Sequence, residues 1–193
     1  MNGAALQLAS RRLSPATLAR RYPGAEIVDL TSRGPEPWVR FSPFFPHGGI
    51  PVPRSEGATS ESVEGIWQAL KVFESADVDP TKLAVTTMKG LKRTVRRFGR
   101  CLGHRDGLAG ASLLPYIRAR HAIYLPAYRW TLEHRLQNEV AALRELAASA
   151  AARDVATVVL DYEVNADVDD PARPLSHAAL VIRYLRGDWP RSA

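Results

Sequence analysis

Apolar residues recur at helical spacing along most of the chain, and this pattern predicts a mainly helical protein. The longest predicted helix covers residues 127–150, where Leu132, Leu136, Val140 and Leu143 repeat at that spacing. The other predicted helices cover residues 15–21, Thr59 or Ser60 through Phe73, 87–98, 113–125 and 176–185. Pro126 is expected to break or kink the chain between the predicted helix 113–125 and the longest helix.

Short runs of β-branched and aromatic residues predict a few strands at 26–30, 38–41 and 156–162, the last one buried. The predicted fold class is therefore mainly α with a few short β-strands (α+β). The 193 residues suit a single compact helical domain. Within it, residues 1–33 supply an N-terminal helix and strand, and residues 34–187 supply the core.

The segment 34–57 is rich in proline and glycine, which excludes a helix there. It also carries several large apolar side chains, which are Trp38, Phe41, Phe44, Phe45 and Ile50. We expect a loop that packs its own aromatic residues against the body of the protein and walls a site.

Composition narrows the class of protein. Hydrophobic residues make up 46% and charged residues 24%, which is typical of a globular protein and not of a disordered, collagen-like or membrane-spanning chain. No stretch approaches the ~18 apolar residues that a membrane span needs. The single cysteine, Cys101, and the lack of a secretion signal in residues 1–13 predict a reducing compartment, and we expect the cytoplasm.

The segment Ser62–Phe73 carries the first candidate site. If it is helical, Glu64, Gln68 and Lys71 stand at i, i+4 and i+7 and share one face. A carboxylate, an amide and an amine in line can bind a sugar or transfer protons. The alternative is a solvated face with a Glu–Lys pair.

The segment 88–105 carries the second candidate site. No acidic residue lies between Asp79 and Asp106, and the formal net charge of the chain is +6. On a predicted helix, one face would carry Lys89, Arg93, Arg96 and Arg100. Such a face attracts the phosphates of a nucleotide or of a nucleic acid, unless it is simply a solvated surface.

Five acidic residues lie at and directly after the end of the predicted strand 156–162 and make the third candidate site, with Asp161, Glu163 and Asp167 among them. Carboxylates at the end of a strand can activate water or hold sugar hydroxyls. A Mg²⁺ or Ca²⁺ site and a plain solvated loop are the alternatives. The spacing fits no EF-hand, and the chain lacks the nucleotide-binding, serine-hydrolase and zinc-protease motifs. The sequence therefore predicts neither a metal nor a cofactor.

Taken in this order, the three segments resemble the NADAR family, the YbiA-like N-glycosidases. The family motif S-V-E-H-x-x-Q-A-x-K-F is matched by Ser62-Val63-Glu64, Gln68-Ala69 and Lys71, and Phe73 lies one position after the phenylalanine of the motif. Further similarities are Phe41–Pro46, Gly99-Arg100, Trp130 and Asp161–Asp167, so the resemblance spans about residues 38–187. Gly65 replaces the histidine of the motif, and the family's turns near residues 169–171 and 174–177 are also absent.

The resemblance implies cleavage of an N-glycosidic bond in a phosphorylated ribosylamine, a related nucleoside-like compound or an ADP-ribosyl adduct on nucleic acid. It implies Glu64, Lys71 and Asp167 as catalytic residues. Glu64 would bind ribose hydroxyls or transfer a proton, and Lys71 would form an imine with C1 of the opened sugar. Asp167 would act as a general base or stabilise the positive charge that develops at the anomeric carbon. The substrate-binding residues would be Phe44, Gln68, Arg97, Gly99, Arg100, Trp130, Asp161 and Glu163.

Two other functions are compatible with the sequence. One is a non-catalytic module that binds a nucleotide or a nucleic acid through a basic helix at 88–105. The other is a metal-dependent hydrolase built on Asp161, Glu163 and Asp167. The sequence does not decide among substrates or oligomeric states.

Overall fold

The computed structural model describes residues 6–191, so the expectation of no signal in residues 1–13 lies partly outside the described residues. The described residues form two compact units. Unit 1 comprises residues 6–42 and 136–191, and unit 2 comprises residues 43–135. The predicted α+β class is confirmed. The single-domain organisation stays a prediction.

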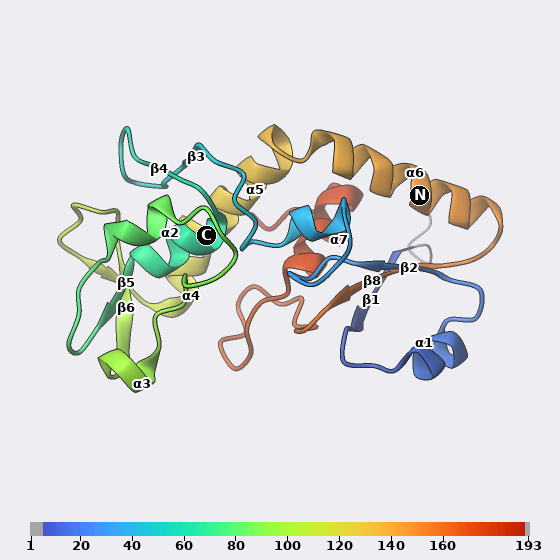
Figure 1. The fold of residues 1–193 in the computed structure, drawn as a ribbon, viewed down its shortest axis with the longest axis horizontal. Helices are drawn as coiled ribbons and strands as arrows, with labels where there is room; N and C mark the ends of the chain where they lie inside the picture. The colour runs from blue at the N-terminus through green and yellow to red at the C-terminus, as the bar shows by residue number, and fades with distance from the viewer. Residues whose placement is uncertain (1–5, 192–193) are drawn as a thin grey trace. The chain divides into compact units, whose positions relative to one another are not determined.

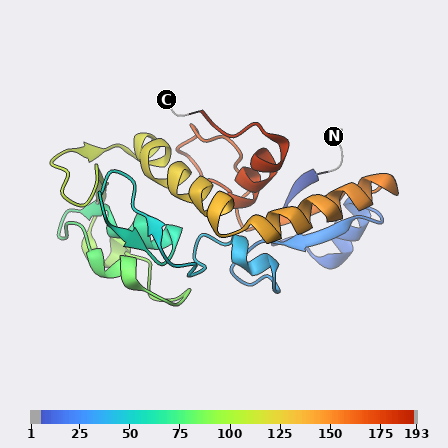
Figure 2. The same ribbon diagram turned by 90° about the horizontal axis from the view of Figure 1, so that it is seen from above.

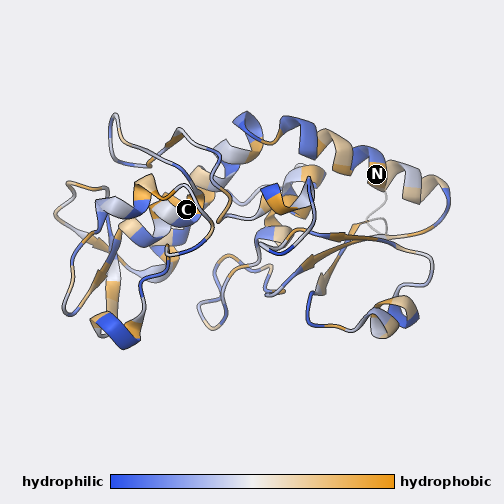
Figure 3. Ribbon diagram, viewed as in Figure 1, coloured by the Kyte–Doolittle hydropathy of each residue, from blue (hydrophilic) through white to orange (hydrophobic). Residues whose placement is uncertain are grey.

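Unit 1 contains a sheet of three parallel strands in the order β1-β8-β2. The strands are β1 (Leu6–Ser10), β8 (Thr157–Asp161) and β2 (Glu26–Asp29). All five residues of the central strand β8 are buried, as its run of apolar residues predicts (Figures 1 and 3). Because the three strands are parallel, their carboxyl ends lie at the same edge of the sheet.

The two faces of this sheet are covered unequally. The long helices α6 (Gln137–Ala152) and α7 (His177–Arg186) lie on one side of the strands, and the short helix α1 (Pro15–Arg21) lies on the other (Figures 1 and 2). Leu18 of α1 packs with Ala9, Val158 and Leu160. On that side of the sheet, one short helix supplies the helical packing.

Most predicted elements of unit 1 are confirmed. The predicted helices 15–21 and 176–185 correspond to α1 and α7, and their caps Ser14 and Ser176 accept hydrogen bonds from the N–H groups of Thr17 and Ala179. The strand predictions 26–30 and 156–162 correspond to β2 and β8. Strand β1 is the element that the sequence pattern missed.

The predicted strand 38–41 is wrong, because these residues form a 3₁₀ helix, η1 (Trp38–Phe41). The Val39 N–H donates to the Pro35 carbonyl and the Arg40 N–H to the Pro37 carbonyl, so the chain turns instead of extending. Phe41 is fully buried, in agreement with a loop that packs its own aromatic residues.

Unit 2 is built from short elements. Its strands are β3 (Ile50–Pro51) with β4 (Thr59–Ser60), and β5 (Lys71–Phe73), β6 (Cys101–Arg105) and β7 (Leu113–Leu114) in an antiparallel sheet. Its helices are α2 (Val63–Ala69), η2 (Pro80–Ala84), α3 (Val95–Phe98), α4 (Tyr116–Ala119), η3 (Arg120–Tyr124) and α5 (Leu125–His134).

The predicted helix from Thr59 or Ser60 to Phe73 is too long at both ends. Ser62 caps α2 instead, since its hydroxyl accepts a hydrogen bond of 3.0 Å from the Gly65 N–H. Leu70 ends the helix, and the next three residues pair with β6. Lys71 therefore begins a strand and does not lie on the helix with Glu64.

The predicted basic helix is also wrong. Only Val95–Phe98 are α-helical, because Gly90 adopts a φ of 74° and Thr94 is extended, and residues 101–105 form a strand. The face that was to join Lys89, Arg93, Arg96 and Arg100 does not exist. The observed arrangement separates these side chains, and Arg93 turns into the protein.

The helices predicted at 113–125 and 127–150 have different boundaries. Residues 113–114 are a strand, and α4, η3 and α5 then follow without interruption to His134. Pro126 lies in the first turn of α5, directly after η3, and the helical run continues through it, so the break expected there is not observed. The helical run ends at His134, because the backbone of Arg135 is not helical. Nε of Arg135 donates a hydrogen bond to the Gly48 carbonyl, and α6 begins two residues later.

Candidate functional site

Helix α2 places Glu64 and Gln68 one turn apart, as the sequence predicts. The Gln68 amide Nε2 donates a hydrogen bond of 2.7 Å to Oε1 of Glu64. Glu64 is only 8% exposed, and this burial raises the pKa of its carboxyl, although Gln68, Lys71 and Lys92 act in the opposite direction. The carboxyl therefore retains its proton at a higher pH than an exposed glutamate would.

Lys71 belongs to the same cluster although it lies on β5. Burial lowers the pKa of its amine, and the negative charge of Glu64 opposes this shift. The positive charges of Lys92 and Arg93 lower the pKa further. A carboxyl with a raised pKa thus lies near an amine with a lowered pKa, which is typical of catalytic acid–base pairs.

His104 is a member of this cluster that the sequence analysis missed. It lies opposite Lys71 in the β5–β6 pair, so both side chains project from the same face. Its ring centroid is 3.8 Å from that of Trp67, and neither ring nitrogen has a hydrogen-bond partner among the described residues. Burial and the charge of Lys71 lower the pKa of His104 to about 3, so the imidazole is neutral at physiological pH.

Arg93 connects Gln68 and Lys71 through hydrogen bonds of its backbone and its side chain. Its backbone N–H donates a hydrogen bond of 2.9 Å to Oε1 of Gln68, and its guanidinium donates to the carbonyls of Gln68, Lys71 and Asp77 at 2.6–3.2 Å. The guanidinium also lies 5.0 Å from the Phe73 ring centroid and 5.2 Å from that of Phe98. Arg93 is therefore a buried structural residue and not part of a solvent-facing basic surface.

Phe44 belongs to the same region because its ring contacts the Lys92 amine. The Lys92 amine lies 5.5 Å from the centroid of the Phe44 ring, and its charge also acts on Glu64 and Lys71. Four predicted site residues are thus brought together in unit 2, namely Phe44, Glu64, Gln68 and Lys71. With Lys92, Trp67 and His104, we call them the Glu64 cluster.

Gly99 and Arg100 form a turn next to Glu74. Gly99 adopts a φ of 80°, and a Cβ there would lie 2.6 Å from Oε2 of Glu74. Arg100 forms an exposed ion pair with the same carboxylate. Arg97 is exposed and lies over the Phe98 ring. These contacts give Gly99 and Arg100 a structural explanation that is independent of substrate.

Trp130 stacks within its own helix. Its ring lies 4.6 Å from that of His134 at an angle of 10°, and the Arg135 guanidinium lies 5.1 Å from its centroid. Among the described residues, no hydrogen bond or ring contact joins Trp130 to the Glu64 cluster. Its predicted role in substrate binding stays a prediction.

The predicted acidic residues belong to unit 1, where Asp161 has a structural role. Its Oδ2 accepts a hydrogen bond of 2.7 Å from the Ser176 hydroxyl and lies 2.9 Å from Nδ1 of His177. Its Oδ1 accepts the Tyr162 N–H, and Nε2 of His177 lies 2.8 Å from the Leu30 carbonyl oxygen. Although serine, histidine and aspartate meet here, the histidine is occupied on both sides, so this network anchors α7.

The other two acids lie on the loop after β8. Glu163 pairs with Arg12 at 3.3 Å, and Asp167 is exposed, with its Oδ1 accepting the Asp169 N–H. Within residues 6–191, no three His, Cys, Asp or Glu side chains are grouped so that they could hold a metal ion. In the same range, no helix is long and apolar enough to cross a membrane.

Residues 10–181 match the model of a family of unknown function, DUF6939. The chain belongs to this family. No curated protein and no solved structure matches the chain. Because DUF6939 carries no assigned function, the resemblance to the NADAR family stays a prediction.

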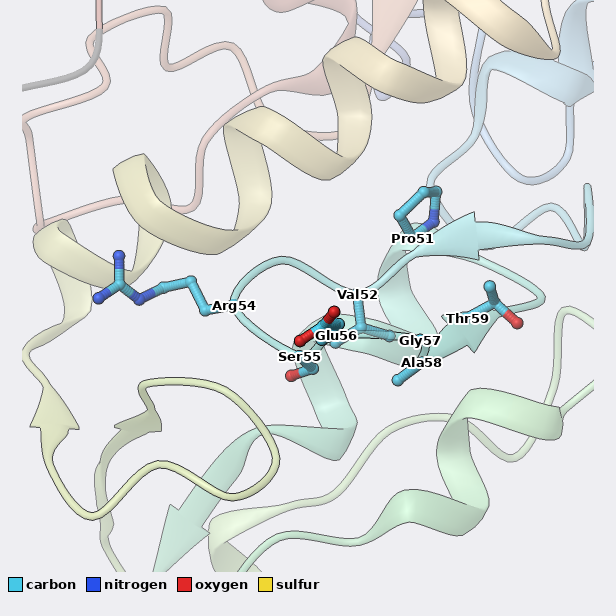
Figure 4. Close-up of a pocket in the computed structure, with 8 residues that line it drawn as sticks. All are labelled: Pro51, Val52, Arg54, Ser55, Glu56, Gly57, Ala58 and Thr59. Atoms are coloured by element: carbon cyan, nitrogen blue, oxygen red, sulfur yellow. The ribbon is translucent and has the colours of Figure 1, made fainter.

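Two cavities of this DUF6939 chain lie away from the predicted residues. One, of about 660 Å³, is a shallow hollow within the β3–β4 loop, from which the Arg54 side chain extends outward to pair with Asp106 (Figure 4). The other, of about 460 Å³, lies in unit 1. No predicted site residue lines either cavity.

Gly65 of α2 lies where a larger residue, such as the histidine of the NADAR motif, would not fit. A Cβ at this position would lie 2.7 Å from the Lys82 carbonyl oxygen and 2.8 Å from the Ser60 hydroxyl. A backbone carbonyl and a serine hydroxyl therefore leave no room for a side chain at residue 65. The departure from the motif is consistent with how α2 packs against η2.

We expect Gly65→Ala to destabilise the protein by about 1–3 kcal/mol, because the added methyl group must displace the Lys82 backbone. An alanine inside a helix ordinarily stabilises it by about 1 kcal/mol relative to glycine, so the clash reverses the usual sign. Urea unfolding of the variant and the wild type measures the difference. An increase in stability would show that α2 and η2 are not packed this closely.

Proposed function

We propose that the Glu64 cluster is a hydrolytic site that cleaves the N-glycosidic bond of a phosphorylated ribosyl compound. One observation carries the proposal: a buried carboxyl with a raised pKa, held by Gln68, lies near an amine with a lowered pKa. The substrate is a ribosylamine or nucleoside-like phosphate, or an ADP-ribosyl adduct. The single cysteine supports a reducing compartment, and we place the reaction in the cytoplasm.

Glu64 acts as the general acid in this proposal. Breaking the bond between C1 of the sugar and the nitrogen of the base requires a proton on the departing nitrogen. A carboxyl with a raised pKa is protonated closer to neutral pH and can donate that proton. Gln68 fixes the carboxyl in place, so that little reorganisation is needed when the proton moves.

Lys71 acts as the nucleophile toward C1. A neutral amine can attack this carbon, and ring opening then gives an imine that water hydrolyses to the free sugar and the amine. The lowered pKa of Lys71 raises the neutral fraction at physiological pH. The neutral His104 beside it adds no positive charge that a bound substrate would have to balance.

The basic segment supplies the phosphate contacts. Several cationic side chains are exposed and have no acidic partner among the described residues; they are Lys89, Lys92, Arg96 and Arg97. Lys92 joins this segment to the cluster through the Phe44 ring, on which a base or sugar can pack. Asp167 lies in unit 1, and the proposal assigns it no step.

The test is release of free base from phosphoribosylamino-pyrimidines and from guanine-linked ADP-ribose. We expect Glu64→Gln to lower the rate by about 100-fold or more, because the amide cannot donate an acidic proton. Glu56→Gln, at an exposed glutamate of the β3–β4 loop, is the matched control and should keep the wild-type rate. Borohydride reduction during turnover should link the sugar to wild-type protein but not to Lys71→Arg. An unchanged rate for Glu64→Gln would remove the proposed site.

A binding module without catalysis is the second candidate function, favoured by the same exposed cations. Its premise can no longer be a basic helix, because residues 86–94 are irregular. Affinity for an oligonucleotide that falls steeply with salt, with no base released from any glycoside, would support this function over hydrolysis.

A further inference from the structure

The cavity of unit 1 lies on the less covered face of the sheet. Side chains of β8 alternate between the two faces, so Val158 and Leu160 face α1, while Asp161 faces α7. Ile27 of β2 lies opposite Val158 in the register and is 43% exposed. Helix α1 is too short to cover this face, and a hollow of about 460 Å³ remains beside it.

The lining of this hollow is mainly apolar. The residues that matter for binding are Arg11, Leu18, Ala19, Ile27, Asp29 and Leu160. The volume of the hollow falls in the range of about 300–1,000 Å³ that is usual for small-molecule sites. An apolar wall with a few polar groups at one side is the usual composition of such sites.

The polar groups are Arg11, which directly follows β1, and Asp29, which is the last residue of β2. Nε of Arg11 donates a hydrogen bond of 2.5 Å to Oδ2 of Asp29. Oδ1 of Asp29 accepts from the N–H and the hydroxyl of Thr31, so both carboxylate oxygens are occupied. Open α/β sheets bind ligands at this edge, beyond the carboxyl ends of the strands.

The Arg11 guanidinium retains binding capacity. Within residues 6–191, its only side-chain hydrogen bond is the one from Nε, and the side chain is 43% exposed. The two terminal amino groups can therefore donate a parallel pair of hydrogen bonds. This pair matches the two oxygens of a carboxylate.

We propose that this hollow is a binding site for a small carboxylic acid with an apolar body. The carboxylate binds the terminal amino groups of Arg11, and the body packs against Leu18, Ile27 and Leu160. The Asp29 carboxylate already pairs with Arg11 and with Thr31, so Arg11 is the charged group of the hollow with free donors. The proposal is independent of the hydrolytic site in unit 2.

The test compares three probes of similar shape: phenylacetate, phenylacetamide and 2-phenylethylamine. Titrations followed by ¹H–¹⁵N NMR should show phenylacetate binding about tenfold more tightly than the other two, with shifts in residues 11–29. Arg11→Gln should abolish the preference for phenylacetate, whereas Arg20→Gln, at an exposed arginine of α1 outside the lining, should keep it.

A second pair of variants separates filling of the hollow from loss of the ion pair. Ala19→Trp places an indole in the hollow and should block binding, while Ala16→Trp, on the same helix but outside the lining, should not. Equal affinity for the three probes, no binding of phenylacetate at millimolar concentration, or binding that persists in Ala19→Trp would overturn the proposal.

Discussion

Replacing Arg93 by alanine should lower the free energy of unfolding by about 3–5 kcal/mol, the largest effect that we expect from a single substitution in unit 2. The guanidinium is the donor for the carbonyls of Gln68, Lys71 and Asp77. Removing a charged donor leaves buried acceptors without partners, which costs more than the bonds contributed. The substitution also removes the cation between the rings of Phe73 and Phe98.

Urea unfolding should distinguish this structural role from a general effect of charge. Arg96→Ala removes an exposed arginine three residues away and should change stability by less than about 0.5 kcal/mol. Arg93→Lys should recover only part of the loss, because an ammonium group cannot reproduce the planar fork that reaches three carbonyls. Similar stabilities for Arg93→Ala and Arg96→Ala would show that Arg93 is not a structural anchor.

In unit 1, Asp161→Asn should cost about 3–5 kcal/mol near pH 6, because it leaves a buried imidazolium without its counter-charge. Burial alone would lower the pKa of His177, but the charge and hydrogen bond of Asp161 outweigh it, so the pKa is raised. Burial alone would raise the pKa of Asp161, but His177, Ser176 and the Ala178 N–H outweigh it, so the pKa is lowered.

These shifts define a pH window. The His177 contribution is complete below its ordinary pKa of 6.5 and is lost as the pH rises through the raised value. The Asp161 contribution is complete above its ordinary pKa of 3.8 and is lost as the pH falls through the lowered value. The difference in stability between wild type and Asp161→Asn should therefore be largest between pH 3.8 and 6.5.

The measurement is urea unfolding from pH 4 to 9 for the wild type, Asp161→Asn and the exposed control Asp167→Asn. His104 complicates the wild-type curve, since its lowered pKa destabilises the fold below pH 6.5. Its contribution cancels in the difference between the wild type and each variant. A difference for Asp161→Asn that does not vary with pH would mean that the pair is not ionised in the folded protein.

The elements that the sequence predicted correctly are those whose signals are local. Ser14-Pro15 and Ser176 mark helix starts through their own side chains, and the apolar run before Asp161 suffices to identify a buried strand. The segment 87–98 has helical spacing of apolar residues but folds otherwise, because Arg93 is held by three carbonyls distant in sequence. Spacing alone cannot show such a competing interaction.

The candidate site was likewise predicted correctly only where its residues are close in sequence. Glu64 and Gln68 form a local i, i+4 pair on one face of α2, as predicted, and a hydrogen bond joins them. Lys71 joins them from a strand and not from the predicted helix. His104 could not be predicted, because its place depends on the register of β6 against β5, which no short motif encodes.

The amide of Gln68 has a consequence for the direction of proton delivery. Its Oε1 accepts the Arg93 N–H, so its Nε2 must face Glu64 and donate to Oε1 of that carboxyl. Accepting this hydrogen bond disfavours protonation of Oε1, so the acidic hydrogen of the neutral carboxyl lies on Oε2. A single backbone N–H, 29 residues further along the chain, thereby selects the oxygen of Glu64 from which a leaving group would be protonated.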